Sequence, residues 1–175
     1  MRFIDPDGMQ ADDWRNKEGK LIYDPKANEG KGAYTKDATE EDKKIGDALN
    51  STEDGKKQFD LLVNSDIPTE IEVTEEKGPS DGTNNYQMGN TALTKDENKK
   101  VESAKITIYA GRIDDFLSVA KTYFDAGKQD LLEEQNKAYG ELNDKFSSII
   151  ANIGHEIEHA NNPKNHIIFL SLIHI

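Results

Sequence analysis

A stripe of apolar residues near the C-terminus constrains the fold of this chain most strongly. The stripe comprises Leu142, Phe146, Ile149, Ile150, Ile153, Ile157 and Ala160. A period of about 3.6 residues predicts a helix with one buried face, because such positions line one side of an α-helix. We expect this helix to end near Asn162, since Pro163 disfavours helical backbone at the residue before it. The chain therefore needs a second layer to cover the apolar face of a long helix.

A pair of histidines lies on the same predicted helix, away from the apolar stripe. Residues 155–159 read HEIEH and fit the pattern H-E-x-x-H, which on a helix binds zinc. His155 and His159 project about 40° apart, and roughly 150° from the middle of the stripe. We therefore expect both histidines to bind Zn²⁺. Glu156 would be the general base that takes a proton from water during peptide hydrolysis.

The motif does not supply a complete zinc site. Catalytic zinc normally takes three protein ligands and a water. The longer pattern H-E-x-x-H-x-x-G-x-x-H would need glycine and histidine where this chain has Asn162 and Asn165. His166 is one position off and follows a proline, so it is a weak candidate. The third ligand is therefore unknown, and we expect it beyond the end of this chain.

Simpler interpretations of the motif remain open. The histidines could be ordinary solvated residues, or part of a charged surface stripe with Glu156 and Glu158. Chance matches to H-E-x-x-H are expected on the order of 0.01 times in a chain of this composition. The zinc interpretation is favoured for that reason.

Composition limits the classes of function. The chain has 175 residues, enough for one domain, and a formal net charge of −12. Such a charge argues against binding to nucleic acid, which requires a basic face. The absence of cysteine excludes disulfides and cysteine metal sites. No run of about 18 apolar residues is present, so we expect no membrane span.

Three further helices are predicted. Thr39 precedes an acidic first helical turn, and Gly55 separates that helix from a second one with an apolar face. A third helix is expected at about 112–126. We interpret its Asp114 and Asp115 as partners of the helix dipole and not as a catalytic pair.

Alternation of apolar and polar residues predicts the strands. Strands are expected at 69–75, weakly at 86–93, and most clearly at 104–110. The polar run 94–105 is interpreted as a solvated loop. We expect strand 104–110 to form the sheet edge that lines the cleft, where a peptide could bind as an added strand.

Two parts of the chain resemble known families. The stretch RFIDPDGM resembles the end of an Rhs/YD-repeat core, and DDWRNKEGKLIYD is similar to a decayed YD repeat. GHEIEHA resembles the helix of a zincin metallopeptidase module found at the C-termini of such proteins, notably in Bacteroidetes. The resemblance implies a toxin domain of a secreted or cell-surface bacterial protein. It also implies delivery to a target cell, a protein or peptide substrate and a cognate immunity protein.

The resemblance also sets the expected boundaries. Residues 1–35 would be the end of the repeat core and a linker, and residues 36–169 an incomplete zincin-like domain. Residues 170–175, LSLIHI, resemble a translated transposon end from sequencing adapters, so we expect native sequence to stop near Phe169 and do not count His174 as a ligand. A following helix would carry the third ligand, and zincins of the glutamate type favour Glu. We expect the 175-residue chain to bind zinc weakly and to show little peptidase activity.

The expected fold is α+β and zincin-like, with a short antiparallel or mixed sheet packed on the motif helix and its C-terminal part missing. The expected function is a zinc metallopeptidase toxin. The alternatives are a non-catalytic metal-binding or interaction tail of a surface protein, and a peptidase that releases the tail from its own core.

Overall fold

A mixed four-stranded sheet organises the described part of the chain. The computed structural model describes residues 14–79, 87–125 and 144–161. The strand order is β1-β4-β6-β5; β6 is parallel to β4 and antiparallel to β5, and β1 is parallel to β4. The strands are β1 (Trp14–Arg15), β4 (Thr69–Thr74), β5 (Gly89–Lys95) and β6 (Val101–Tyr109). A separate antiparallel pair is formed by β2 (Tyr23–Asp24) and β3 (Ala33–Tyr34).

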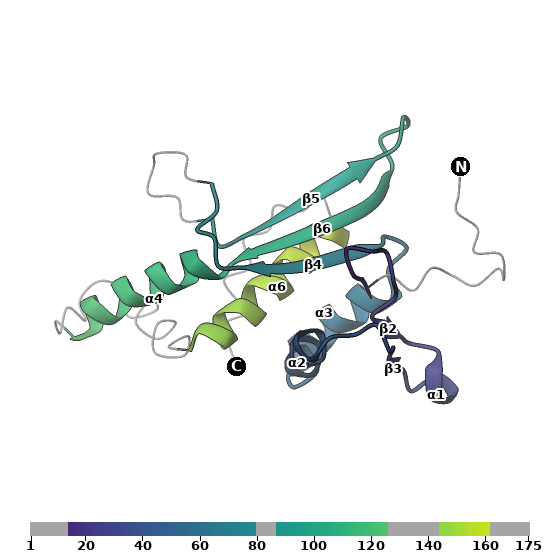
Figure 1. Ribbon diagram of the computed structural model, residues 1–175, viewed down its shortest axis with the longest axis horizontal. Helices are drawn as coiled ribbons and strands as arrows, with labels where there is room; N and C mark the ends of the chain where they lie inside the picture. The colour runs from purple at the N-terminus through teal and green to yellow at the C-terminus, as the bar shows by residue number, and fades with distance from the viewer. Residues whose placement is uncertain (1–13, 80–86, 126–143, 162–175) are drawn as a thin grey trace.

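Helices cover one face of this sheet. Figure 1 shows α6 running beneath β5 and β6, with α2 and α3 on the same side of the sheet. The helices are α1 (Ala27–Gly30), α2 (Glu40–Leu49), α3 (Glu53–Asn64), α4 (Ala110–Asp125) and α6 (Lys145–Asn161). The predicted mixture of helices with a sheet on the motif helix is confirmed at this level. A zincin-like fold stays a prediction.

The start of α2 follows the capping chemistry in the sequence. The Thr39 hydroxyl accepts a hydrogen bond from the backbone N–H of Asp42, whose carboxylate accepts one from the backbone N–H of Thr39. Gly55 does not separate the two helices as expected. It lies inside the first turn of α3, which is capped by Thr52. A β-carbon at Gly55 would collide with the Leu49 carbonyl, so this position is glycine because the helices meet closely there.

The sheet region differs from the prediction in two ways. The polar run 94–105 is not a loop, because it contains the end of β5, a turn and the first half of β6. The turn is closed by hydrogen bonds between Asp96 and Lys100, with Lys99 at φ 64°. Polar residues are tolerated in these strands because one face of the hairpin is exposed.

Strand 104–110 is not the edge of the sheet. As β6, it lies in the middle between β4 and β5, and Ile106 and Ile108 are fully buried there. Its strong alternation marks a central strand with one covered face. The outer strand beside α6 is the weakly predicted β5, which is shifted from the expected 86–93 to 89–95.

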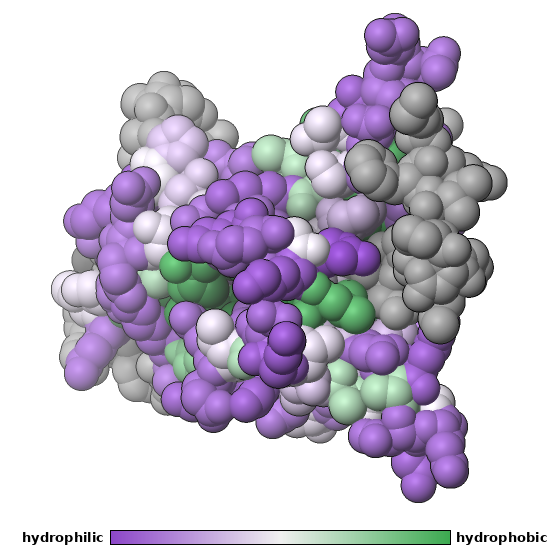
Figure 2. Space-filling view, turned by 45° about the vertical axis from the view of Figure 1, so that its right-hand side comes forward, coloured by the Kyte–Doolittle hydropathy of each residue, from purple (hydrophilic) through white to green (hydrophobic). Residues whose placement is uncertain are grey.

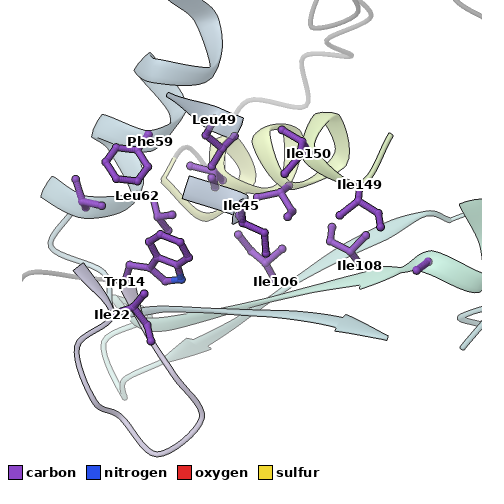
Figure 3. Packing of buried hydrophobic residues seen from close by; sticks show 14 of the residues in the cluster. Trp14, Ile22, Ile45, Leu49, Phe59, Leu62, Ile106, Ile108, Ile149 and Ile150 are labelled. Atoms are coloured by element: carbon purple, nitrogen blue, oxygen red, sulfur yellow. The ribbon is translucent and has the colours of Figure 1, made fainter. Parts of the chain in front are cut away.

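One hydrophobic core joins these layers. Figure 3 shows Ile108 of β6 beside Ile149 of α6 and Ile106 of β6 beside Ile45 of α2, with Trp14 toward the other end of the cluster. Trp14 and Ile22 are 1% and 0% exposed. The segment that resembles the end of a repeat core therefore packs with the rest of the chain from Trp14 onward.

Ion pairs fasten the elements at the surface. Lys145, at the start of α6, contacts Glu75 and Asp114, and Asp115 pairs with Lys77. Because α4 begins at Ala110, both aspartates lie beyond its first turn, and the dipole interpretation was wrong. The face shown in Figure 2 is mostly hydrophilic, with a small hydrophobic area near its centre. Within the described ranges, no helix is long and apolar enough to cross a membrane.

Candidate metal centre

Helix α6 brings the two motif histidines together. The Nε2 atoms of His155 and His159 are 3.0 Å apart, and the two rings are nearly perpendicular, at 88°. Two imidazole nitrogens on one tetrahedral zinc, each at 2.0–2.1 Å, would be separated by about 3.3 Å. The same 3.0 Å also allows one ring N–H to donate to the other ring. The two nitrogens are therefore close enough to share either a proton or a metal ion.

Partial burial favours the neutral form that a metal requires. Burial lowers the pKa of His155 below its ordinary 6.5, and the neighbouring His159 lowers it further. The nearby carboxylates of Glu156 and Glu158 oppose this shift. A neutral imidazole has a lone pair to give to a metal, whereas imidazolium does not.

Glu156 is held against strand β5. Its side chain is 7% exposed, and Oε2 accepts a hydrogen bond of 2.6 Å from the Thr91 hydroxyl. A β-carbon at Gly89 would lie only 2.9 Å from Oε1 of Glu156. Glycine at position 89 therefore lets the strand approach the carboxylate.

A pocket connects the motif with the edge strand. Its volume is about 350 Å³, and Glu156 and His159 line it together with five residues of the β5 region: Gln87, Gly89, Asn90, Thr91 and Leu93. A predicted general base and a predicted zinc ligand therefore face the same hollow. Two further polar lining residues, Asn90 and Thr91, lie on β5, the strand that the sequence predicted most weakly.

Ser148 and Asn152 lie on α6 before the histidines. Ser148, one helical turn before Asn152, is 3% exposed, and the Asn152 side chain donates to the Ser148 carbonyl. The helix surface around these two residues is thus partly covered. Access to the motif comes from the side of β5.

The third ligand is not found in the described part of the chain. Across residues 14–79, 87–125 and 144–161, no group of three His, Cys, Asp or Glu side chains is placed to hold a metal ion. His166 lies outside the described residues, as do positions 170–175. The two histidines fit zinc as neighbouring ligands, and the remaining ligand stays a prediction.

Sequence reasoning missed a second contact to the motif. Gln58 of α3 is 7% exposed, and its Nε2 donates to Oε1 of Glu158 at 2.8 Å. Oε1 of Gln58 is buried and has no hydrogen-bond partner. Glu158 precedes His159 directly, so this contact ties the end of the motif to α3. Only the long-range fold reveals it, because the two residues are 100 positions apart.

No protein-family model, curated protein or solved structure matches this chain. A functional proposal must therefore rest on the residues of the chain itself.

Proposed function

We propose that this chain carries the core of a zinc metallopeptidase site, with His155 and His159 as metal ligands and Glu156 as the general base. One observation carries the proposal: the two imidazole nitrogens lie 3.0 Å apart, while His159 and Glu156 line one pocket. Zinc bound there would lower the pKa of a coordinated water toward 7 and polarise a peptide carbonyl.

Glu156 would carry out the proton transfers of the reaction. A buried carboxylate in a pocket can take a proton from the attacking water and later deliver it to the leaving amine. One oxygen, Oε2, is already engaged by Thr91, so Oε1 is the oxygen available for this transfer. An amide at this position could not accept the proton in the same way.

The outer strand offers a place for an extended peptide. In the described sheet, β5 pairs with β6 on one side and lies at the end of the strand order. The backbone groups on its other side could bind a substrate as an added strand, next to Glu156. The proposed peptide-binding strand is therefore β5, and not the strand 104–110 that the sequence indicated, because that strand lies inside the sheet.

The proposal includes a biological role as an antibacterial toxin. On the resemblance of GHEIEHA and RFIDPDGM to Rhs-associated zincin toxins, the domain would act as a delivered antibacterial effector. Its partners would be a protein substrate and a cognate immunity protein. Growth arrest of bacteria that express the domain, and relief by the neighbouring gene, would support this role.

A peptidase assay tests the function directly. The full product of the gene is incubated with unfolded casein and a peptide library, with added Zn²⁺ or with a chelator. We expect cleavage that requires Zn²⁺ and is stopped by the chelator. Tight zinc binding without cleavage of any peptide would contradict the peptidase and support the metal-binding tail. Cleavage only at a site within the protein's own chain would identify the self-processing alternative.

A further inference from the structure

Two residues of strand β5, Gly89 and Thr91, lie against the Glu156 carboxylate. Gly89 and Thr91 pair across the strands with Ile108 and Ile106, which are buried on the helix side of the sheet. Directly paired residues point to the same face, so positions 89 and 91 both face α6. Gly89 provides space for Oε1 and Thr91 provides a donor for Oε2.

The Thr91 hydroxyl contacts Glu156 twice. It lies 2.6 Å from Oε2 and 3.1 Å from the backbone carbonyl oxygen of the same residue. A hydrogen bond to a charged carboxylate is shorter and stronger than one between neutral groups. A glutamate side chain has three rotatable bonds, and a bond at its far end selects one arrangement of them.

We propose that Thr91 is a positioning residue that fixes the Glu156 carboxylate by occupying Oε2 and leaving Oε1 turned toward the pocket. The assignment rests on the proposed function for its catalytic meaning, whereas the contact itself does not depend on metal. Thr91 would not touch the scissile bond. It would act through Glu156, by keeping one oxygen in place for proton transfer.

A side chain at position 89 should also displace the Glu156 carboxylate. A β-carbon there would also lie 3.0 Å from Cγ of Glu156 and 3.1 Å from Cδ1 of Ile108. The carboxylate is the flexible partner in this contact, so it is the group that must move. Gly89→Ala should therefore displace Glu156 while leaving the Thr91 hydroxyl in the chain.

The chain offers a matched set of variants. Thr91→Val keeps the shape but removes the hydroxyl, and Thr91→Ser keeps the hydroxyl. Thr94→Val makes the same exchange at an exposed position of the same strand. Gly89→Ala completes the set.

The first readout needs no metal or activity. In metal-free protein labelled with ¹³C-glutamate, the Glu156 carboxyl resonance is assigned by its loss in Glu156→Gln. We expect that resonance to shift in Thr91→Val and Gly89→Ala, to stay near its wild-type position in Thr91→Ser, and to be unchanged in Thr94→Val. A resonance that does not move in Thr91→Val would overturn the proposal.

The second readout separates positioning from stability. In the full product of the gene, Thr91→Val should lower kcat on the order of tenfold to a hundredfold, as a misplaced catalytic group does, with KM and zinc affinity nearly unchanged. Thr91→Ser should restore most of the rate. An unchanged kcat in Thr91→Val, or equal losses in the Ser and Val variants, would overturn the positioning role while leaving the peptidase standing. If wild-type protein cleaves no peptide, the proposed function fails and Thr91 loses its catalytic role, and the carboxyl resonance then reports the contact alone.

Discussion

Glu156 of α6 and Thr91 of β5, 65 positions apart in the sequence, are joined by a hydrogen bond of 2.6 Å between the threonine hydroxyl and the buried carboxylate. The bond fastens the motif helix to the outer strand of the sheet. It also gives one oxygen of the buried Glu156 side chain a hydrogen-bond donor in place of water.

Glu156→Gln should separate structure from catalysis. The amide has nearly the same volume, and its oxygen can still accept from Thr91, so the urea midpoint and zinc affinity should stay near wild type. Hydrolysis should be abolished because an amide cannot take the proton from water. Near-wild-type turnover in Glu156→Gln would disprove the assignment of the general base.

Glu156→Ala should behave differently from Glu156→Gln in stability. It empties a buried site and leaves the Thr91 hydroxyl without its carboxylate acceptor. The unfolding free energy should fall by about 0.5–1.5 kcal/mol for the lost hydrogen bond, because the Thr91 hydroxyl keeps the backbone carbonyl of residue 156 as an acceptor, and further for the cavity. Urea unfolding of both variants provides the comparison, and equal stabilities would contradict the observed hydrogen bond.

The buried stripe of α6 should carry much of the stability. Ile157 is 0% exposed, whereas Phe146 on the same helix is 40% exposed. Ile157→Ala should therefore cost about 2–5 kcal/mol of unfolding free energy. Phe146→Ala should cost clearly less, although it removes a larger side chain. The reverse order in urea unfolding would show that α6 does not bury the face described.

Acid should destabilise the metal-free protein partly through His155. Its pKa in the folded state lies below the 6.5 of an exposed histidine, because burial disfavours the charged form. As pH falls below about 6.5, the unfolded chain binds a proton that the folded chain resists, so stability falls. His155→Gln should lose less stability than wild type between pH 7 and pH 5, with chelator present. An equally steep loss in the variant would exclude His155 as a contributor.

The sequence could predict elements whose signals are local. Thr39 and the acidic turn after it placed the start of α2, and the apolar stripe placed α6, because caps and periodicity depend on neighbours along one helix. The spacing of His155 and His159 likewise predicted their proximity. These features need no knowledge of the remaining chain.

Features that depend on distant partners could not be predicted in this way. Strand β5 has few apolar residues, so its alternation is faint, and nothing local marks Thr91 as the partner of Glu156. The strand with the clearest alternation, β6, is predicted at the edge of the sheet, whereas it lies between β4 and β5. A strand's position in a sheet depends on pairing with other strands, which alternation alone does not encode.

Zinc titration of three histidine variants tests the central claim most directly. Metal-free wild type, His155→Ala, His159→Ala and His166→Ala are titrated with Zn²⁺ against a chromophoric chelator at pH 7.5. We predict that either motif substitution lowers affinity at least about tenfold, since even residues that only orient zinc ligands cost 10–100-fold when mutated. His166→Ala should bind like wild type. Unchanged affinity in His155→Ala, or a larger loss in His166→Ala than in His155→Ala, would contradict the proposed metal site.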